Sequence, residues 1–289
     1  MRNAITVDVE EYFHPSEVCQ SADFAAWEKF PSRVEMATGR ALELLARHGV
    51  QATFFVLGWV ARRHPGVVRQ IARAGHEIGC HGYAHQLVYD LTPREFREDT
   101  ERAQAAIADA CGQLPRVYRA ASYSITSRSW WALEILVECG FTHDSSIYPI
   151  RHDRYGMPGF GVESRRIETP AGDIFEAPIA TARLSDRSAA PVGGGAYLRL
   201  LPYQYTAAGL RRINQQERRP ACVYFHPWEL DPEQPRLTNG LLSRIRTYAG
   251  LRTMEAKLDR LLREFQFTTL TAAYPACSPR PAPTEVVAT

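Results

Sequence analysis

The sequence lacks the features that mark several specialised protein classes. No stretch of its 289 residues is long and apolar enough for a transmembrane helix, and the N-terminus reaches Asp8 before any apolar signal region could form. The net charge is only +2 and the basic residues are dispersed, so no nucleic-acid-binding surface is expected. We therefore expect a cytoplasmic protein, with action in the periplasm or at a membrane as an alternative.

Cysteine is also scarce, and its spacing shows no framework. The six cysteines include no Cys-x-x-Cys pair, which favours reduced thiols in a core over a disulfide or zinc scaffold. They stand at Cys19, Cys80, Cys111, Cys139, Cys222 and Cys277. What the chain does contain, 45% hydrophobic and 23% charged residues, describes an ordinary globular protein.

Strand and helix patterns alternate along the chain at a spacing of about 30 residues, which predicts a parallel sheet or a β/α barrel. Capping boxes at Ser32–Glu35 and Thr92–Glu95 predict the starts of two helices. Short apolar runs predict strands at residues 5–10, 52–58, 76–80, 117–120, 141–147, 221–225 and 267–271. The expected helices occupy residues 32–48, 65–74, 92–110, 130–139, 207–215 and 241–265, the last broken near Gly250.

The alternation breaks between Tyr148 and Tyr205. This stretch is rich in proline and glycine, with a short strand expected at 174–179. Its run Gly193–Gly195 lacks the Lys-Ser/Thr of a phosphate loop and no helix is expected to open there, so it predicts a flexible turn. We expect one domain over residues 1–274 with an insertion at about 148–205, and a flexible tail at 275–289.

Three histidines within ten residues, His76, His81 and His85, mark the most informative stretch. His81 and His85 follow a predicted strand and are four residues apart, so both imidazoles could face one cation. The metalloprotease pattern H-E-x-x-H fails because Cys80 stands three residues after Glu77. The alternative is that His81 ends a strand and His85 lies in a surface loop, with no metal.

Ionisable residues stand at the ends of five predicted strands: Asp8 and Glu10, His81 and His85, Arg119, Asp144, and His226. A parallel barrel gathers the carboxyl ends of its strands on one face, where catalytic groups lie. Polar groups that converge in a pocket are the default candidate for an active site. The pattern therefore predicts a catalytic site rather than dispersed surface charges.

These residues resemble a known family. The segments 6–10, 81–85, 119–122, 144–146 and 225–226 are similar to the successive motifs of the polysaccharide deacetylases of the NodB homology type, carbohydrate esterase family 4. The closer likeness is to the branch in exopolysaccharide gene clusters of bacteria with exosortase (PEP-CTERM) sorting, in which Asp-Val-Glu-Asp-Tyr-Phe and His-Pro-Trp-Glu are typical. The resemblance implies a distorted (β/α) barrel of about seven strands that holds a divalent metal, usually zinc, with cobalt, nickel or manganese as alternatives.

The resemblance also implies a role for each matching residue. Glu10, His81 and His85 would be the metal ligands, Asp8 the general base, His226 the general acid, and Arg119 the partner that keeps Asp8 ionised and oriented. The oxyanion and the substrate would be held near Ser122, Tyr123, Asp144 and Trp228. In that chemistry a bound zinc ion activates water, and His226 protonates the departing amine.

Two departures from the family pattern affect these expectations. Val9 separates Asp8 from Glu10 where adjacent aspartates are usual, which leaves Glu11 as a rival ligand. Ala121 stands where proline is usual, which removes a fixed φ from the loop expected to hold the oxyanion.

The function expected is metal-dependent N-deacetylation of amino sugars in a bacterial polysaccharide or its precursor. The alternatives are hydrolysis of small non-peptide amides, or carbohydrate binding on a degenerate scaffold.

Overall fold

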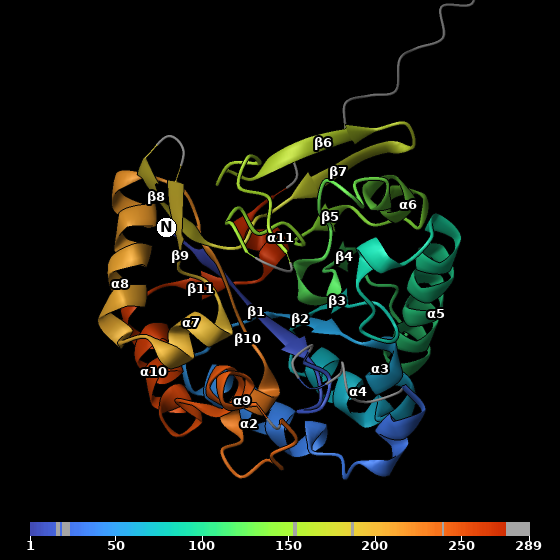
Figure 1. The fold of residues 1–289 in the computed structure, drawn as a ribbon, viewed down its shortest axis with the longest axis horizontal. Helices are drawn as coiled ribbons and strands as arrows, with labels where there is room; N and C mark the ends of the chain where they lie inside the picture. Colours follow the sequence, from blue (N-terminus) through green and yellow to red (C-terminus); the bar gives the residue numbers. More distant parts are fainter. Residues whose placement is uncertain (16–17, 19–23, 153–154, 186–187, 239, 276–289) are drawn as a thin grey trace, which may run out of the picture.

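Seven parallel strands form a distorted barrel in the computed structural model, which describes residues 1–15, 18, 24–152, 155–185, 188–238 and 240–275 (Figure 1). In spatial order they are β10 (Cys222–Phe225), β1 (Asn3–Val9), β2 (Thr53–Val56), β3 (Glu77–Cys80), β4 (Val117–Tyr118), β5 (His143–Asp144) and β7 (Gly172–Glu176). A parallel bridge from Ile179 to Cys222 joins the two ends of this series. The expected α/β barrel is thereby confirmed.

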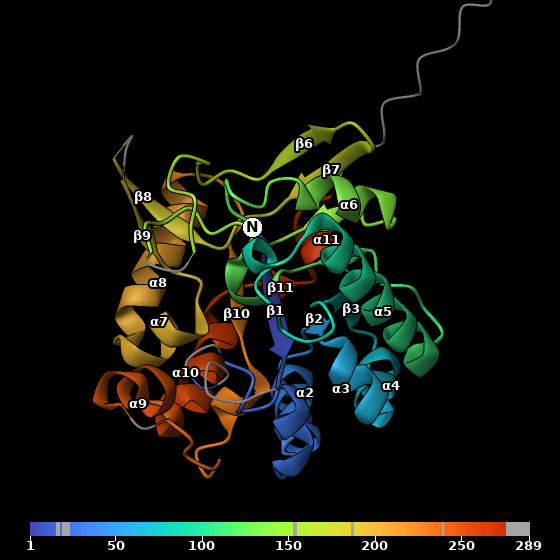
Figure 2. The same ribbon diagram turned by 45° about the vertical axis from the view of Figure 1, so that its right-hand side comes forward.

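Helices surround the strands on the outside. The helices α3 (Gly58–Arg63), α4 (Pro65–Arg73), α5 (Pro93–Cys111) and α6 (Ala132–Glu138) lie on one side, and α7 (Gly195–Leu200), α8 (Tyr203–Arg211) and α10 (Leu251–Glu264) on the other (Figures 1 and 2). The remaining α-helices are α2 (Val34–Arg47), α9 (Leu241–Tyr248) and α11 (Leu270–Ala273). Short 3₁₀ helices are found at η1 (Phe24–Lys29), η2 (Val88–Asp90), η3 (Ala121–Tyr123) and η5 (Pro227–Leu230), and a short π-helix at η4 (Arg212–Gln216). Within the described chain, no helix is both long and apolar enough to cross a membrane.

The helix ends show which local signals were decisive. The capping box at Thr92 is confirmed, because its side chain accepts from the Glu95 backbone N–H while the Glu95 carboxylate accepts from the Thr92 N–H. The box at Ser32 is wrong: α2 has Arg33 as its N-cap, and the Ser32 hydroxyl donates to Glu11 instead. The break near Gly250 is confirmed by its φ of +80° between α9 and α10.

The stretch expected as an insertion contributes directly to the barrel. Its predicted strand at 174–179 is β7, which pairs in parallel with β5 and antiparallel with β6 (Arg165–Thr169). A separate hairpin of β8 (Thr181–Ser185) and β9 (Ser188–Pro191) follows. The last predicted strand extends only over β11 (Phe267–Thr268), which pairs with the start of β1 before α11 begins.

The glycine run does not form the flexible turn that was expected, because α7 opens at Gly195. A Cβ at Gly193 would lie 2.5 Å from the Cys222 carbonyl oxygen, and one at Gly195 would lie 2.1 Å from Glu229 Oε2. The glycines are therefore needed because the chain passes close to β10 and to Glu229. A glycine run in the sequence alone does not distinguish such close packing from a flexible turn.

The cysteines of the described chain are free thiols, at Cys80, Cys111, Cys139 and Cys222. Burial raises the pKa of the Cys80 thiol, so it stays protonated in the core. Cys19, Cys277 and the tail expected over 275–289, except Pro275, lie outside the described residues.

Candidate active site

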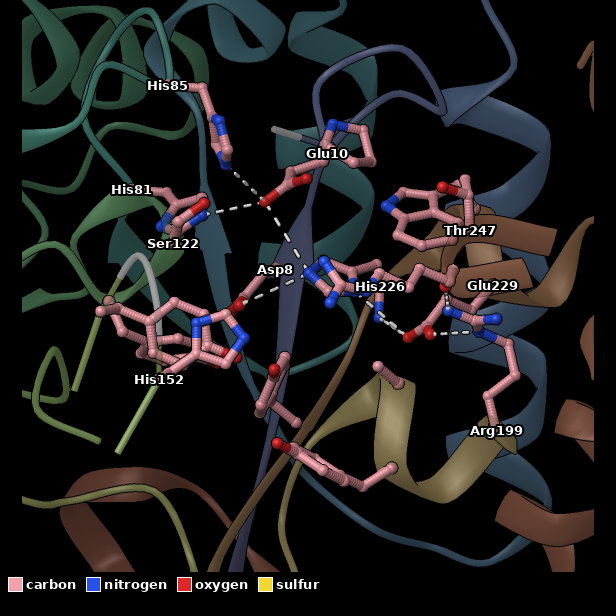
Figure 3. A pocket seen from close by; sticks show the side chains of 18 of the residues that line it. Asp8, Glu10, His81, His85, Ser122, His152, Arg199, His226, Glu229 and Thr247 are labelled. Carbon is pink, nitrogen blue, oxygen red and sulfur yellow. Dashed lines mark hydrogen bonds and ion pairs between the residues drawn. The ribbon is translucent and has the colours of Figure 1, made fainter. Parts of the chain in front are cut away.

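A buried cluster of Glu10, His81 and His85 lies at the carboxyl end of the barrel (Figure 3). Glu10 directly follows β1, and His81 directly follows β3, which is next but one to β1 in the sheet. Glu10 Oε1 is 3.0 Å from His81 Nε2 and 3.1 Å from His85 Nε2. Two segments that are distant in sequence, the ends of β1 and β3, thus bring one oxygen and two nitrogens together.

This donor set fits a divalent metal. His81 Nδ1 is 2.7 Å from the Arg119 carbonyl oxygen; a carbonyl only accepts, so Nδ1 carries the hydrogen and Nε2 presents its lone pair. Ligand atoms about 2.0–2.2 Å from a tetrahedral ion lie roughly 3.3–3.6 Å apart. The 3.0 and 3.1 Å from Glu10 Oε1 to the two imidazole nitrogens are close to this range. Burial alone would raise the pKa of Glu10, but the neighbouring imidazoles of His85 and His226 hold it well below its usual range. The carboxylate is therefore anionic, as a ligand must be.

The loop that carries the two histidines is held by α5. The backbone turns at Gly82, with a φ of +71°, and again at His85, with a φ of +52°, a conformation that non-glycine residues seldom adopt. Asp99 Oδ2 accepts a hydrogen bond of 2.8 Å from the Tyr83 backbone N–H, and the Arg102 guanidinium lies 3.6 Å from the centre of the Tyr83 ring. Sequence reasoning missed Asp99, because a single carboxylate within a helix gives no local signal of such a contact.

Glu11, the rival ligand, faces another part of the molecule. Its carboxylate accepts from the Ser32 hydroxyl and from the Arg33 backbone N–H, at 3.0 and 3.1 Å, at the start of α2. Burial raises the pKa of Glu11, opposed by these hydrogen bonds. The structure thus groups Glu10, not Glu11, with the histidines.

Asp8 lies next to the cluster and contacts Arg119, which is fully buried. Arg119 donates from one terminal nitrogen to Asp8 Oδ1 and to the Thr6 hydroxyl, both at 2.7 Å, and from the other to the Ser145 hydroxyl at 2.9 Å. The guanidinium also lies 4.2 Å from the centre of the Phe55 ring. Burial opposes its charge, but Asp8 raises the pKa of Arg119 above the usual value. Arg119 therefore fixes the orientation of the Asp8 carboxylate.

His226 faces Asp8 and Glu10 from β10. Its Nε2 is 4.0 Å from Asp8 Oδ2 and 3.9 Å from Glu10 Oε1. Its Nδ1 is 3.1 Å from Glu229 Oε2, and Glu229 Oε1 accepts a hydrogen bond of 2.9 Å from Arg199 on α7. Burial would lower the pKa of His226, but Glu10, Glu229 and Asp8 outweigh it and raise it to about 9.

Sequence reasoning missed Glu229 and Arg199, although they form a buried chain behind His226 (Figure 3). Glu229 is visible in retrospect within the string His226-Pro-Trp-Glu, because a carboxylate three residues after a histidine can return to it around one turn. Arg199 is 30 residues away and has no comparable signal.

An open pocket of about 410 Å³, large enough for a small ligand, is lined by the side chains of Asp8, Glu10, His81, His85 and His226. Ser122 and Tyr123 both line it and both have positive φ, +49° and +54°, which is strained backbone of the kind often found at functional sites. Trp228 also lines the pocket and stacks on His226, with ring centres 5.0 Å apart. Three further tyrosines, Tyr155, Tyr197 and Tyr224, give the pocket aromatic walls.

Asp144 is the exception among the predicted site residues, since it does not line this pocket. It is fully buried beside Glu176, accepts from the Ser146 hydroxyl, and receives a hydrogen bond from the Glu176 carboxyl. Burial raises the pKa of Asp144, and burial together with the Asp144 charge raises the pKa of Glu176 well above its usual range. Asp144 contacts the barrel interior and not the cavity where a substrate could bind.

Two family models divide the chain. Residues 27–142 match the model "Polysaccharide deacetylase", and residues 145–275 match "Domain of unknown function (DUF3473)". The first match includes His81, His85 and Arg119, and the second includes His226 and Glu229. Over less than half of its length, the chain is thus similar to polysaccharide deacetylases.

Curated proteins similar to this chain align over less than half of its length. A chitooligosaccharide deacetylase of Rhizobium leguminosarum bv. trifolii is 35% identical over 96 residues, which cover 32% of this chain and 45% of that protein. A peptidoglycan-N-acetylglucosamine deacetylase of Bacillus cereus is 34% identical over 82 residues, or 28% of this chain and 30% of that protein. The alignment thus spans less than half the length of either relative.

Solved structures agree with the deacetylase fold over nearly the whole chain. A proposed polysaccharide deacetylase from Mycobacterium smegmatis superposes with a TM-score of 0.59 at 20% identity, covering 92% of this chain and 85% of that one. A carbohydrate esterase family 4 pseudoenzyme from Bacillus anthracis gives a TM-score of 0.51 at 16% identity, covering 94% and 64% of the two chains. At these identities the likeness establishes the fold alone.

Proposed function

We propose that this protein is a metal-dependent deacetylase that removes N-acetyl groups from amino sugars of a bacterial exopolysaccharide or its precursor. The observation that carries the proposal is the position of Glu10 Oε1, 3.0 and 3.1 Å from the Nε2 atoms of His81 and His85, with Asp8 and His226 beside it. A divalent metal held by Glu10, His81 and His85, most suitably zinc, would supply an activated water and polarise the acetamide carbonyl.

The remaining residues supply proton transfers on two sides of the acetamide. Asp8, oriented by its hydrogen bond from Arg119, accepts a proton from the attacking water. His226, whose Nδ1 lies 3.1 Å from Glu229 Oε2, donates a proton to the nitrogen of the departing amino sugar. The backbone at Ser122 lies on the pocket wall beside His81, where it can contact the acetamide oxygen (Figure 3).

Aromatic side chains of the pocket suit a sugar substrate. Tyr123 and Trp228, with the other tyrosines of the wall, present flat apolar faces beside polar groups, as carbohydrate recognition requires. The relatives named as chitooligosaccharide and peptidoglycan N-acetylglucosamine deacetylases support an N-acetylated glycan as the substrate class. The motif likeness to the exopolysaccharide-locus branch supports the finer assignment.

The test is acetate release from N-acetylglucosamine oligomers, measured after chelation and again after zinc or cobalt is added back. Release that stops with chelator and returns with metal is expected. The variant Asp8→Asn should lose turnover and keep its metal content. His81→Ala should lose both, because His81 is one of the proposed metal ligands and Asp8 is not.

A binding-only protein, as the pseudoenzyme likeness would allow, binds these oligomers and releases no acetate with metal bound. Full activity in Asp8→Asn would refute the assignment of the base.

A further inference from the structure

The helix α9 carries an apolar face that the rest of the described chain leaves uncovered. Leu241 is 77% exposed, Leu242 is 62% exposed and Ile245 is 47% exposed. Residues i, i+1 and i+4 share one side of an α-helix, so the three side chains form one patch, here called the α9 face. Single exposed leucines are common on protein surfaces, but three on one eight-residue helix are not.

The α9 face is continuous with the mouth of the pocket. Arg246 follows Leu242 by four residues, so it is the next side chain along the same face, and it lines the pocket together with Thr247. Leu200 of the adjoining α7 also lines the pocket and is 40% exposed. Figure 2 shows α9 at the periphery of the molecule, below α7.

The charged residues of α9 and of the segments next to it in sequence have one sign. Arg244 and Arg246 are exposed, and across the described residues neither takes part in an ion pair. The sequence from Arg236 to Met254 contains four arginines and no aspartate or glutamate. An occupant of this face must therefore be apolar at its centre and anionic at its edge.

The shape and chemistry of the face decide between occupants. Leucine and isoleucine lack the flat rings that stack on sugars, so the face is ill suited to extend the glycan-binding pocket. A second copy of this chain would need roughly 20–30 residues a side for a stable interface, and would bring the same arginines to the contact. Aliphatic side chains beside arginines match the boundary between acyl chains and anionic headgroups.

We propose that the α9 face docks onto a membrane surface that contains anionic lipids, with the mouth of the pocket held next to that surface. The docking proposal depends on α9 and not on the proposed deacetylase activity. If the protein both docks and deacetylates, its substrates are N-acetylated glycans that are presented at a lipid surface.

The test is cosedimentation of the full chain with vesicles, made either of phosphatidylcholine alone or of phosphatidylcholine and phosphatidylglycerol in equal parts. Binding to the mixed vesicles is expected, with weakening by salt because the arginines contact headgroups. The variant Leu241→Ser/Leu242→Ser/Ile245→Ser should bind at least about ten-fold more weakly, since each aliphatic side chain withdrawn from water contributes to partition. Arg244→Gln should bind mixed vesicles more weakly and leave the low binding to phosphatidylcholine unchanged.

Matched controls come from exposed leucines elsewhere. Leu114 is 65% exposed and Leu184 is 60% exposed, so Leu114→Ser/Leu184→Ser removes comparable apolar surface away from α9 and should bind like the unaltered protein. Acetate release from soluble oligomers should be equal in the triple variant and the control, which separates docking from catalysis.

Three results would overturn the proposal. These are an absence of vesicle binding, equal binding by the triple variant, and concentration-dependent dimers that the triple variant abolishes. The last would assign the α9 face to a second copy.

Discussion

Replacing Glu229 by glutamine removes one charge from the centre of a buried chain while keeping its size. Glu229 Oε2 accepts from the His226 backbone N–H at 3.0 Å and lies 3.1 Å from Nδ1, and Oε1 accepts from Arg199 at 2.9 Å. Glutamine has a single acceptor oxygen, so its amide NH₂ must face a donor on one of these two sides. The change therefore weakens either the hydrogen bond between Glu229 and His226 or the one from Arg199.

The expected loss of activity follows from the charge-assisted hydrogen bond to His226. Hydrogen bonds to charged groups contribute about 1.5–3 kcal/mol, which corresponds to about a 10- to 150-fold fall in kcat/KM. Glu229 is among the groups that raise the pKa of His226 to about 9, so its loss lowers that pKa. The alkaline limb of the kcat/KM profile should move to lower pH, because His226 must be protonated to act as the acid.

Stability should fall as well, because Arg199 is buried and loses its counterion. Breaking a buried ion pair costs about 3–5 kcal/mol. The lower end is expected, since Arg199 keeps hydrogen bonds of 2.6 Å to the carbonyls of Ala249 and Arg246. The double variant Glu229→Gln/Arg199→Met removes both charges and should recover stability without recovering the pH profile.

The assay is acetate release across pH on metal-loaded protein, with chemical unfolding measured in parallel. Glu163→Gln is the control, because Glu163 and Arg183 form an exposed pair whose loss costs at most about 1 kcal/mol. An unaltered alkaline limb in Glu229→Gln, together with kcat/KM within two-fold of the control, would refute the role assigned to Glu229.

Three further changes test the elements around the site. In Gly195→Ala the new Cβ would meet Glu229 Oε2 at 2.1 Å, so kcat/KM should fall as in Glu229→Gln, whereas Gly66→Ala, with no atom within 4 Å of its Cβ, should change nothing. Asp99→Asn removes one acceptor oxygen from the side chain that holds the loop of His81 and His85. Metal affinity, measured by chelator competition, should fall about 10- to 100-fold, and unchanged affinity would contradict the role of Asp99. Glu176 is protonated when folded and ionises above about pH 4.3 when unfolded, so wild-type stability should fall as pH rises through that range. Glu176→Gln keeps the donor to Asp144 and removes this loss, so it should be more stable than wild type in unfolding at about pH 8 and similar near pH 4.

The barrel was predictable because its signals are local and repeat along the chain. Continuous apolar runs such as β2 and capping boxes such as Thr92–Glu95 each report one element, and their alternation implies parallel strands. The box at Ser32 failed because Glu11, 21 residues earlier, takes its hydroxyl. The glycines at 193–195 were misinterpreted because their cause lies on β10 and at Glu229.

The site was predictable where each residue stands at the end of a strand. Asp8, Glu10, His81, Arg119 and His226 meet because parallel strands bring their carboxyl ends together. Asp144 follows the same rule, yet its side chain contacts Glu176 inside the barrel. A residue at the end of a strand lies at the carboxyl end of the barrel. Whether its side chain points into the pocket depends on the alternation of side chains along the strand and on the neighbouring strand.

The two segments matched by family models each lack part of the site. The first contains His81, His85 and Arg119, the second contains His226 and Glu229, and the carboxylates of Asp8 and Glu10 precede both. The barrel strands are divided in the same way, because β2, β3 and β4 lie in the first segment, β7 and β10 lie in the second, and β1 precedes both. Residues 145–275 therefore provide the strand that carries the proposed acid, and we expect neither segment to release acetate on its own.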